Sequence, residues 1–321
     1  MPNTPSASPS EAWIITGPTS GIGRRTALEL ASHGTVVLVG RDPGKLREVQ
    51  AEIEARPGGR ALAVVADLSD VASVRRAAAE IVMLGLPIAG LLNNAGIMPT
   101  RPGRSAQGWD LAFATNHLGP FAFTEALIPY LPDGANVVFT CSGVEDPKRK
   151  PAVTAGFRGG RYISAEASAR GEWAPGGSSR PGFDAYATSK QCELAAVFAF
   201  TRETPRLRFN AVEPGFNPGT GLGRDASPFL RFIAKHLLAP LAPLIKYWST
   251  PQHAARVLTT VLTSESGETG VYYDENGKPM TASAQVRDPA FDARVAAQTR
   301  ALLATVPVDS LTQSFLTRKE P

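Results

Sequence analysis

The chain has few of the residues that mark secreted, disulfide-bonded or metal-binding proteins. Its 321 residues include two cysteines, Cys141 in an apolar run and Cys192 in a helical pattern, which neither form a disulfide framework nor have metal-ligand spacing. The four histidines are scattered without a ligand pattern, so no metal site is predicted, and His117 is expected to be packed. Both thiols are expected to be buried and reduced.

Long apolar runs and a block of positive charge are also missing. The best candidate for a membrane span, 237–248, contains Pro240, Pro243 and Lys246, so no integral membrane segment is predicted. The formal net charge is +4, but lysines and arginines are spread along the chain, which argues against a nucleic-acid partner. The first ten residues lack the basic start and the apolar stretch of a secretory signal. A disordered tail over residues 1–11 and a cytoplasmic location are expected.

The chain does have a regular alternation of strand-length apolar runs and helix-length periodic segments. Six runs are rich in Val, Leu and Ile, as expected for parallel strands buried on both faces. They lie at 13–16, 35–40, 61–67, 88–94, 135–142 and 207–213. Helical patterns lie at 21–32, 43–55, 71–83, 109–130 and 183–201, and a late strand is predicted at 270–274. This order predicts an α/β fold with a doubly wound parallel sheet, a Rossmann fold, in one domain over residues 12–305.

Two segments interrupt this alternation. Residues 145–182 are rich in Gly, Pro, Arg and Ser with little periodicity, and such a long loop is usually functional or disordered. The proline-broken, amphipathic residues 216–248 include Arg231, Lys235 and His236, and they favour a helical substrate lid over a contact with a membrane surface. Residues 306–321 are expected to form a C-terminal tail.

The turn after the first predicted strand has the composition of a phosphate-binding loop. It reads TGPTSGIG at 16–23 and runs directly into a helical pattern. Glycines let the backbone approach a pyrophosphate closely, and the N–H groups of the following helix stabilise its charge. An ordinary glycine-rich turn is the alternative. The residues predicted to surround the phosphates are Gly17, Thr19, Ser20, Gly21, Ile22 and Gly23.

Arg41 directly follows the second predicted strand, where the adenosine ribose of a dinucleotide lies in this type of fold. An acidic side chain there favours a free 2′-hydroxyl group, whereas an arginine pairs with a 2′-phosphate. The neighbouring Asp42 is either a ribose ligand or the N-cap of the helix that begins at Pro43. The sequence therefore favours NADP(H) over NAD(H).

Tyr186 and Lys190 lie four residues apart in the stretch YATSK, on one face of a predicted helix. A free tyrosine has a pKa of about 10, so proton exchange near neutral pH requires a depression of roughly two to three units, or about 3 to 4 kcal/mol. The cation of Lys190, together with the positive charge of an oxidised nicotinamide, could supply it. Such a pair alone is common on helix surfaces, so the surrounding motifs decide its meaning.

Those motifs follow the order typical of one enzyme family. Besides TGPTSGIG, the chain has Asp67-Leu68, NNAG at 93–96, Asn116, Ser142 at a strand end, YATSK and Pro214-Gly215. From residue 13 to residue 274 the chain therefore resembles the short-chain dehydrogenase/reductase family of the classical type.

The resemblance implies a role for each matched residue. Tyr186 would be general acid in carbonyl reduction and general base in alcohol oxidation, and Ser142 would bind the substrate oxygen. Lys190 would hold the nicotinamide ribose and tune Tyr186, and Asn116 would position a water that passes protons to Lys190. Further cofactor-binding residues would be Asp67, Leu68, Asn93, Ala95, Gly96, Pro214 and Gly215, in addition to Tyr186 and Lys190.

Two departures from the family pattern bear on the substrate. Thr220 lies one residue beyond the usual threonine after Pro214-Gly215, so its cofactor role is in doubt. The insert 145–182 resembles that of retinol dehydrogenases and light-dependent protochlorophyllide reductases, which act on large apolar molecules, and it is expected to form part of the substrate wall.

The predicted function is NADP(H)-dependent interconversion of a carbonyl and an alcohol on a bulky, apolar small molecule. Reduction of an activated C=C bond in the same site and a non-catalytic dinucleotide-binding scaffold remain alternatives. The resemblance also makes a homo-oligomer an option.

Overall fold

The structure is a computed structural model that describes residues 11–217 and 247–308. Seven parallel strands form one sheet in the order β3-β2-β1-β4-β5-β6-β7. They are β1 (Ala12–Thr16), β2 (Thr35–Gly40), β3 (Arg60–Val65), β4 (Ile88–Asn93), β5 (Asn136–Thr140), β6 (Arg208–Val212) and β7 (Tyr272–Tyr273). The strand order reverses between β1 and β4, and open α/β sheets bind ligands at such a point.

The six apolar runs predicted as strands are confirmed, and their ends agree within two residues. The late strand is shorter than the predicted 270–274, since β7 has only two residues. Gly270 has a φ of +73° and a turn at 274–277 follows, so the backbone leaves the extended conformation at both ends.

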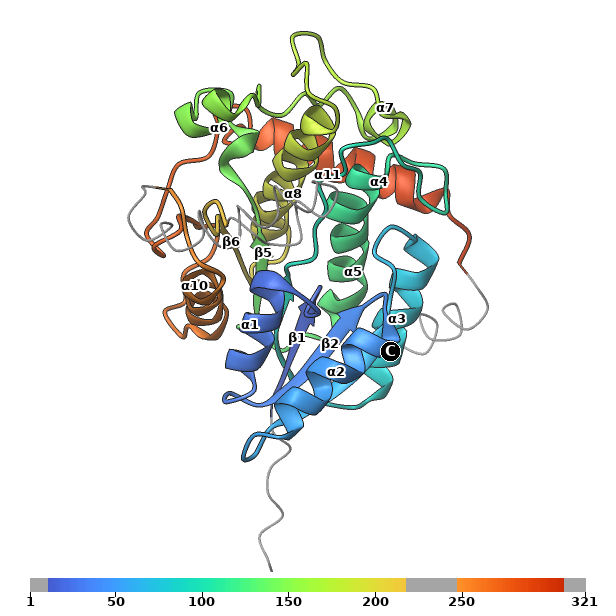
Figure 1. The fold of residues 1–321 in the computed structure, drawn as a ribbon. Helices are drawn as coiled ribbons and strands as arrows, with labels where there is room; N and C mark the ends of the chain where they lie inside the picture. The colour runs from blue at the N-terminus through green and yellow to red at the C-terminus, as the bar shows by residue number, and fades with distance from the viewer. Residues whose placement is uncertain (1–10, 218–246, 309–321) are drawn as a thin grey trace, which may run out of the picture.

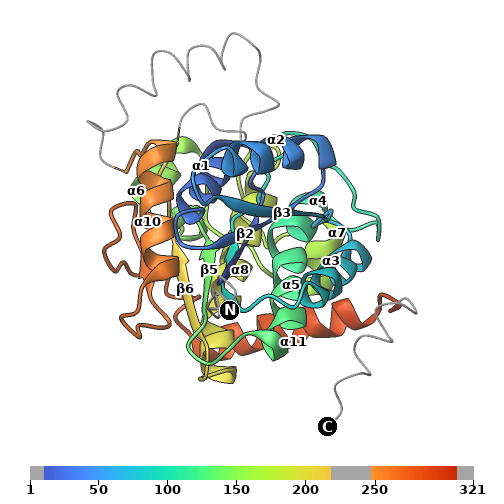
Figure 2. The same ribbon diagram turned by 90° about the horizontal axis from the view of Figure 1, so that it is seen from below.

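Helices cover both faces of the sheet (Figures 1 and 2). On one face lie α1 (Gly21–Leu30), α2 (Pro43–Glu54) and α10 (Pro251–Thr263), which pack with the sheet in one apolar cluster. On the other face lie α3 (Val71–Met83), α5 (Gly119–Leu127) and α8 (Phe183–Glu203), with α11 (Pro289–Ala304) packed on α8. The result is the predicted three-layer, doubly wound arrangement.

Aspartates fix where several helices begin. Asp42, Asp70 and Asp288 accept hydrogen bonds from backbone N–H groups in the first turns of α2, α3 and α11. Prolines occupy the first position of α2 and α11, where a missing N–H group does no harm.

The helix predicted for 109–130 is present from Leu111 to Tyr130, but it is not α-helical throughout. Asp110 caps α4 (Leu111–Phe113), which passes into a π-helical turn at Ala114–Leu118 before α5 begins, and a 3₁₀ turn follows at Ile128–Tyr130. Single π turns inside helices are frequently found at functional sites, and this one carries Asn116.

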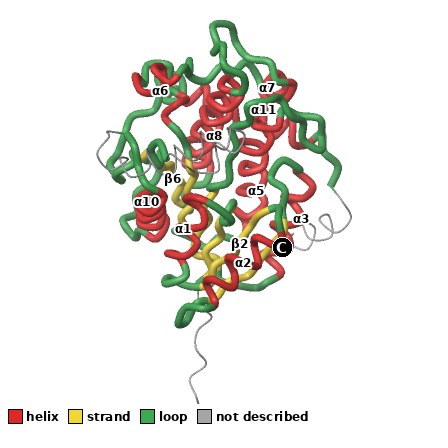
Figure 3. The backbone as a smooth tube through the Cα atoms, viewed as in Figure 1, coloured by secondary structure: helices red, strands yellow, loops and turns green. Residues whose placement is uncertain are grey.

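The insert 145–182 is mostly loop, with two short helices, α6 (Lys150–Ala155) and α7 (Ala165–Arg170) (Figure 3). It follows β5 through a 3₁₀ turn at Gly143–Glu145 and leads into α8. The insert therefore lies beside the carboxyl end of β5 and the first turns of α8.

The folded domain reaches slightly beyond the predicted boundary at residue 305. Val306 is buried in the core, and its carbonyl oxygen accepts a hydrogen bond from Arg75 at 2.9 Å. Most of the predicted lid, 218–246, together with residues 1–10 and 309–321 of the predicted tails, lies outside the described residues.

Candidate active site

The glycine-rich turn after β1 is shaped by close backbone approaches. Gly17 has a φ of +68°, and a Cβ atom there would lie 2.9 Å from the Cα of Ala95. A Cβ on Gly23 would lie 2.2 Å from the carbonyl oxygen of Gly17. Ser20 is the N-cap of α1, but its side chain makes no capping hydrogen bond. The N–H groups at this helix start are therefore available to an anion.

Asn94, which the sequence prediction omitted, holds this turn against β4. Its Nδ2 donates to the carbonyl oxygens of Thr16 (3.0 Å) and Gly17 (3.4 Å). The backbone N–H groups of Asn94 and Ala95 both donate to the Thr16 hydroxyl at 3.0 Å. The NNAG motif contains Asn94, so the signal was present in the sequence.

Asp42 is the N-cap of α2, one of the two roles that the sequence suggests for it. Its Oδ1 accepts hydrogen bonds from the N–H groups of Gly44 and Lys45, at 3.0 and 3.1 Å, and these bonds lower its pKa. Within the described chain, the exposed Arg41 has no ion-pair partner. Arg24 is engaged with Glu52 at 2.7 Å. Arg41 is therefore the free cation at the end of β2.

The other predicted cofactor residues on this side surround the ends of β3 and β4. Asp67 accepts hydrogen bonds from both the N–H and the hydroxyl group of Ser69, and the neighbouring Leu68 is buried. Asn93 is buried and donates to the hydroxyl of Thr124 on α5 at 3.0 Å. Asn93 thus ties β4 to the helix layer, in keeping with a supporting role.

Asn116 joins the loop after β4 to helix α8. Its Oδ1 accepts from the N–H group of Ile97 (2.8 Å), and its Nδ2 donates to the carbonyl oxygen of Ile97 and to the hydroxyl of Ser189, both at 2.9 Å. Both N–H groups of its amide are therefore used in positioning the loop and α8. The neighbouring His117 is packed, as expected, between Phe113 and Phe121, and burial lowers its pKa to about 3.

Ser142, Tyr186 and Lys190 come together at the carboxyl end of β5. Ser142 follows this strand in an extended conformation, and its side chain hydrogen-bonds that of Tyr186. Lys190, one turn further along α8, donates to the carbonyl oxygen of Thr140 at 2.7 Å. A Cβ on Gly96 would lie 3.7 Å from the Lys190 Nζ, so the NNAG loop borders the same cluster.

The protein groups around Tyr186 do not by themselves lower its pKa, and the positive charge of an oxidised nicotinamide, which the prediction also invokes, would act in addition to them. Burial raises the pKa, and the opposing effect of Lys190 is reduced because Glu193 lies beside it. The Lys190 Nζ is 2.6 Å from the Glu193 Oε2, and both side chains are at most 5% exposed. The sequence analysis missed Glu193, although its spacing of three residues from Lys190 was readable.

An apolar cluster borders Tyr186 on the side of the insert. Phe157 stacks on Phe183 with ring centroids 4.1 Å apart and lies 6.2 Å from the Tyr186 ring. Met98 and Val144 pack against the same cluster. The insert therefore contributes one ring, that of Phe157, to an apolar cluster next to Tyr186.

Pro214 and Gly215 follow β6 at the same edge of the sheet. Gly215 has a φ of +71°, and both carbonyl oxygens accept hydrogen bonds from the Asn217 side chain at 2.9 Å. Thr220 lies outside the described residues.

Comparison with known proteins gives the family. A family model described as short chain dehydrogenase matches residues 11–153. A short-chain dehydrogenase/reductase from Armillaria gallica is 30% identical over 243 residues, which span 74% of this chain and 75% of that protein. The chain belongs to the short-chain dehydrogenase/reductase family.

The chain is also similar to other short-chain dehydrogenases/reductases. Retinol dehydrogenase 11 from Homo sapiens is 36% identical over 129 residues, which span 40% of this chain and 41% of that protein. Among solved structures, a short-chain dehydrogenase from Shigella flexneri complexed with NADP is 25% identical with a TM-score of 0.59, over 83% of this chain and 96% of that chain.

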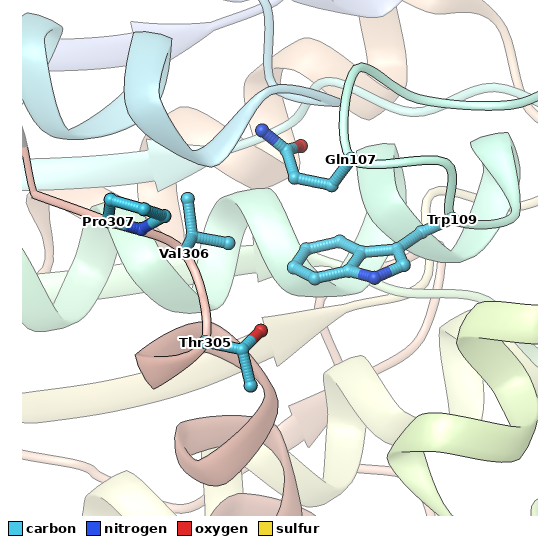
Figure 4. A pocket seen from close by; sticks show the side chains of 5 residues that line it. All are labelled: Gln107, Trp109, Thr305, Val306 and Pro307. Carbon is cyan, nitrogen blue, oxygen red and sulfur yellow. The ribbon is translucent and has the colours of Figure 1, made fainter.

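This short-chain dehydrogenase/reductase also has an open pocket of about 330 Å³ away from the cluster of Tyr186. It lies between the loop of Gln107 and Trp109 and the residues that follow α11 (Figure 4). None of the predicted site residues lines it. Within 11–217 and 247–308, no group of His, Cys, Asp and Glu is arranged to hold a metal ion, and no helix is both long and apolar enough to cross a membrane.

Proposed function

We propose that the chain catalyses NADP(H)-dependent interconversion of a carbonyl and an alcohol on a bulky, apolar small molecule. The observation that carries this proposal is the meeting of Ser142, Tyr186 and Lys190 at the carboxyl end of β5, beside the loop of Gly96. A hydroxyl, a phenol and an ammonium group in contact can bind a substrate oxygen and exchange a proton with it.

The glycine-rich turn fits the pyrophosphate of a dinucleotide. Side chains are excluded at Gly17 and Gly23, and the uncapped start of α1 presents N–H groups. Bound there, the nicotinamide cofactor would supply or accept a hydride. Lys190 would hold its ribose, and Tyr186 would donate its phenol proton to the substrate oxygen during reduction while Ser142 stabilises the developing negative charge.

Arg41 supports NADP(H) as the cofactor. The neighbouring Asp42 caps α2 with its Oδ1, and its Oδ2 lies 3.4 Å from the Lys45 Nζ, so its carboxylate is engaged with α2. A guanidinium group pairs well with a 2′-phosphate. The NADP complex of the related Shigella flexneri enzyme is in keeping with this choice.

The apolar cluster next to Tyr186 supports an apolar substrate. Phe157 and Phe183 lie beside Tyr186, with Met98 and Val144 against them, and none of these side chains is charged. A molecule that reaches Tyr186 from this side exchanges water for apolar contact. The similarity to retinol dehydrogenase 11 is in keeping with a large apolar substrate.

A titration of the purified protein with NADPH and NADH tests the cofactor. We expect NADPH to bind more tightly, and Arg41→Ala to weaken NADPH binding about tenfold or more while leaving NADH binding unchanged, because one charge-assisted contact contributes about 1.5 to 3 kcal/mol. Arg47→Ala, an exposed arginine on α2, is the matched control and should change neither affinity. Equal affinities for both nucleotides would contradict the assignment of NADP(H).

A screen of ketones and aldehydes with NADPH tests the reaction. Tyr186→Phe should lower kcat by a factor on the order of 10² to 10⁴ while NADPH binding persists, because the general acid is lost. Product analysis separates the alternatives: a saturated carbonyl product would indicate reduction of a C=C bond. A protein whose function in its host is unchanged by Tyr186→Phe would be a scaffold and not this enzyme.

A further inference from the structure

The buried ion pair of Lys190 and Glu193 is a charged feature of the site that the proposed reaction does not use. Both residues lie on α8, three residues apart, with Nζ and Oε2 at 2.6 Å. The Lys190 and Glu193 side chains are 5% and 1% exposed. Burying two charges is unfavourable unless they lie close enough to compensate each other. The close contact of Lys190 and Glu193 provides this compensation.

The groups around Glu193 leave Lys190 as its cationic partner. Directly after β5, the Cys141 thiol lies near Glu193, and burial keeps this thiol neutral by raising its pKa. Glu213, beyond β6, pairs with Arg149 of the insert at 2.5 Å. These contacts direct the negative charge of Glu193 toward Lys190.

The remaining titratable groups near α8 are engaged elsewhere or neutral. Glu145, in the 3₁₀ turn after β5, accepts a hydrogen bond from the Ser283 N–H group at 2.8 Å. Tyr272 of β7 is buried, and burial raises its pKa, so its phenol is neutral. His117 of the π-helical turn is neutral near pH 7 because burial lowers its pKa to about 3. Burial raises the pKa of Glu193 to about 7 and the contact with Lys190 opposes this rise, so Glu193 is the carboxyl group in direct contact with Lys190.

A carboxylate bonded to Lys190 changes what Tyr186 experiences. A lone ammonium group stabilises a nearby phenolate strongly in a poorly solvated site. An ammonium group bound to a carboxylate acts as a dipole. The electric field of a dipole is weaker than that of a lone charge and falls off faster with distance. We propose that Glu193 is a positioning residue that holds Lys190 and offsets its charge at Tyr186, so that Tyr186 stays protonated and the enzyme favours carbonyl reduction.

This inference rests on the proposed function and adds a direction to it. In reduction, the substrate carbon gains the hydride that NADPH provides, the C=O double bond becomes a C–O single bond, and the Tyr186 O–H bond breaks as its proton moves to that oxygen. Solvent then returns a proton to Tyr186. Oxidation of an alcohol begins instead from the Tyr186 phenolate, which Glu193 disfavours.

The variant Glu193→Gln tests the proposal through pH profiles. It keeps an oxygen acceptor for Lys190 but removes the charge. We expect the midpoint of the alkaline rise in kcat/KM for alcohol oxidation with NADP⁺ to fall by about one pH unit or more, which raises the oxidation rate about tenfold below that midpoint. Glu193→Asp keeps the charge and should restore the profile toward wild type. An unchanged midpoint in Glu193→Gln would overturn the proposal.

Asp292→Asn, in α11, is the control for loss of another buried carboxylate that pairs with a cation of α8. Asp292 pairs with Arg202 of α8 at 3.0 Å, and the Asp292 side chain is 2% exposed. This variant should lose stability without moving the oxidation midpoint. If it shifted the midpoint as Glu193→Gln does, the effect would belong to the helix and not to Lys190, and the proposal would fail.

A titration of the phenol itself needs no substrate and no folded variant at position 193. The tyrosinate absorbance of wild type minus that of Tyr186→Phe gives the midpoint for Tyr186 directly, with and without NADPH. We expect a midpoint above that of free tyrosine, about 10. A midpoint below about 9 would show Lys190 acting uncompensated and overturn the inference, even if carbonyl reduction were established. Absence of any reductase activity would instead defeat the proposed function and leave this midpoint measurable.

Discussion

The two halves of the sheet bury different kinds of polar side chain. Up to residue 135, the described buried polar side chains are uncharged, and His117 is held neutral. From residue 136 onward the buried set also contains one ammonium and five carboxyl groups, namely Lys190, Glu145, Glu193, Glu213, Glu275 and Asp292. Recognition of a cofactor needs backbone shape and an exposed cation, whereas proton transfer needs charge shielded from water. Buried charge is therefore found in the half of the sheet to which we assign proton transfer, and not in the half to which we assign recognition of the cofactor.

A methyl group in the uncharged half should give the largest effect. Gly17→Ala adds a Cβ atom 2.9 Å from the Cα of Ala95 at a φ of +68°. The strain of about 1 to 3 kcal/mol should move the turn and raise the Kd for NADPH about 10- to 100-fold. Binding followed by nucleotide fluorescence measures this.

Gly58→Ala is the control for Gly17→Ala, because it introduces the same backbone strain without a clash of the added Cβ atom. Gly58 has a φ of +74°, but a Cβ there would meet no atom within 4 Å. This variant should lose only some stability and bind NADPH normally. If Gly17→Ala also bound NADPH normally, the backbone shape of the turn would not determine the affinity for NADPH.

A smaller effect is expected from the apolar cluster in the other half. Phe157→Ala removes the ring that stacks on Phe183 and lies 6.2 Å from Tyr186. We expect KM for a bulky apolar substrate to rise about tenfold, while KM for a small carbonyl compound and the Kd for NADPH change little. Ile163→Ala, an exposed apolar residue of the same insert, should leave all three values as in wild type. A uniform rise in every KM would point to general disruption.

The sequence predicted the uncharged half better than the charged one. Strands such as β2 and β4 are continuous apolar runs, and the glycine turn follows local rules of backbone freedom, so both are readable from neighbouring residues. Asn116 was singled out, but the π-helical turn around it was not predicted, because the turn accompanies hydrogen bonds to Ile97 and to Ser189, which is far away in the sequence.

The charged half depends on contacts that no local pattern reveals. The patterning predicts neither α10 nor α11, nor the short helices inside the insert. Burial of Glu193 and Glu145 follows from packing of β5, α8 and the loop before α11, which are distant in sequence. For the same reason the sequence did not show what opposes Lys190 at Tyr186: Lys190 is visible in the motif, but its carboxylate partner Glu193 and the burial of Tyr186 are not.

The smallest effect is expected for Glu145. Its substitution tests whether burial of a carboxyl group in the second half lowers the free energy of unfolding at neutral pH. Burial raises the pKa of Glu145 from 4.5 to about 7, so the folded protein binds this proton more tightly than the unfolded chain does. The stability from this group is complete below about pH 4.5 and is lost as pH rises through about 7. Glu145→Gln should therefore reduce the loss of unfolding free energy between pH 5 and 7 by about 2 kcal/mol, as measured by urea denaturation at both values. Glu166→Gln, an exposed change in α7, should leave that pH dependence intact. An equally steep loss in Glu145→Gln would mean that burial of this carboxyl group does not raise its pKa, and Glu145 would then no longer support the contrast between the two halves.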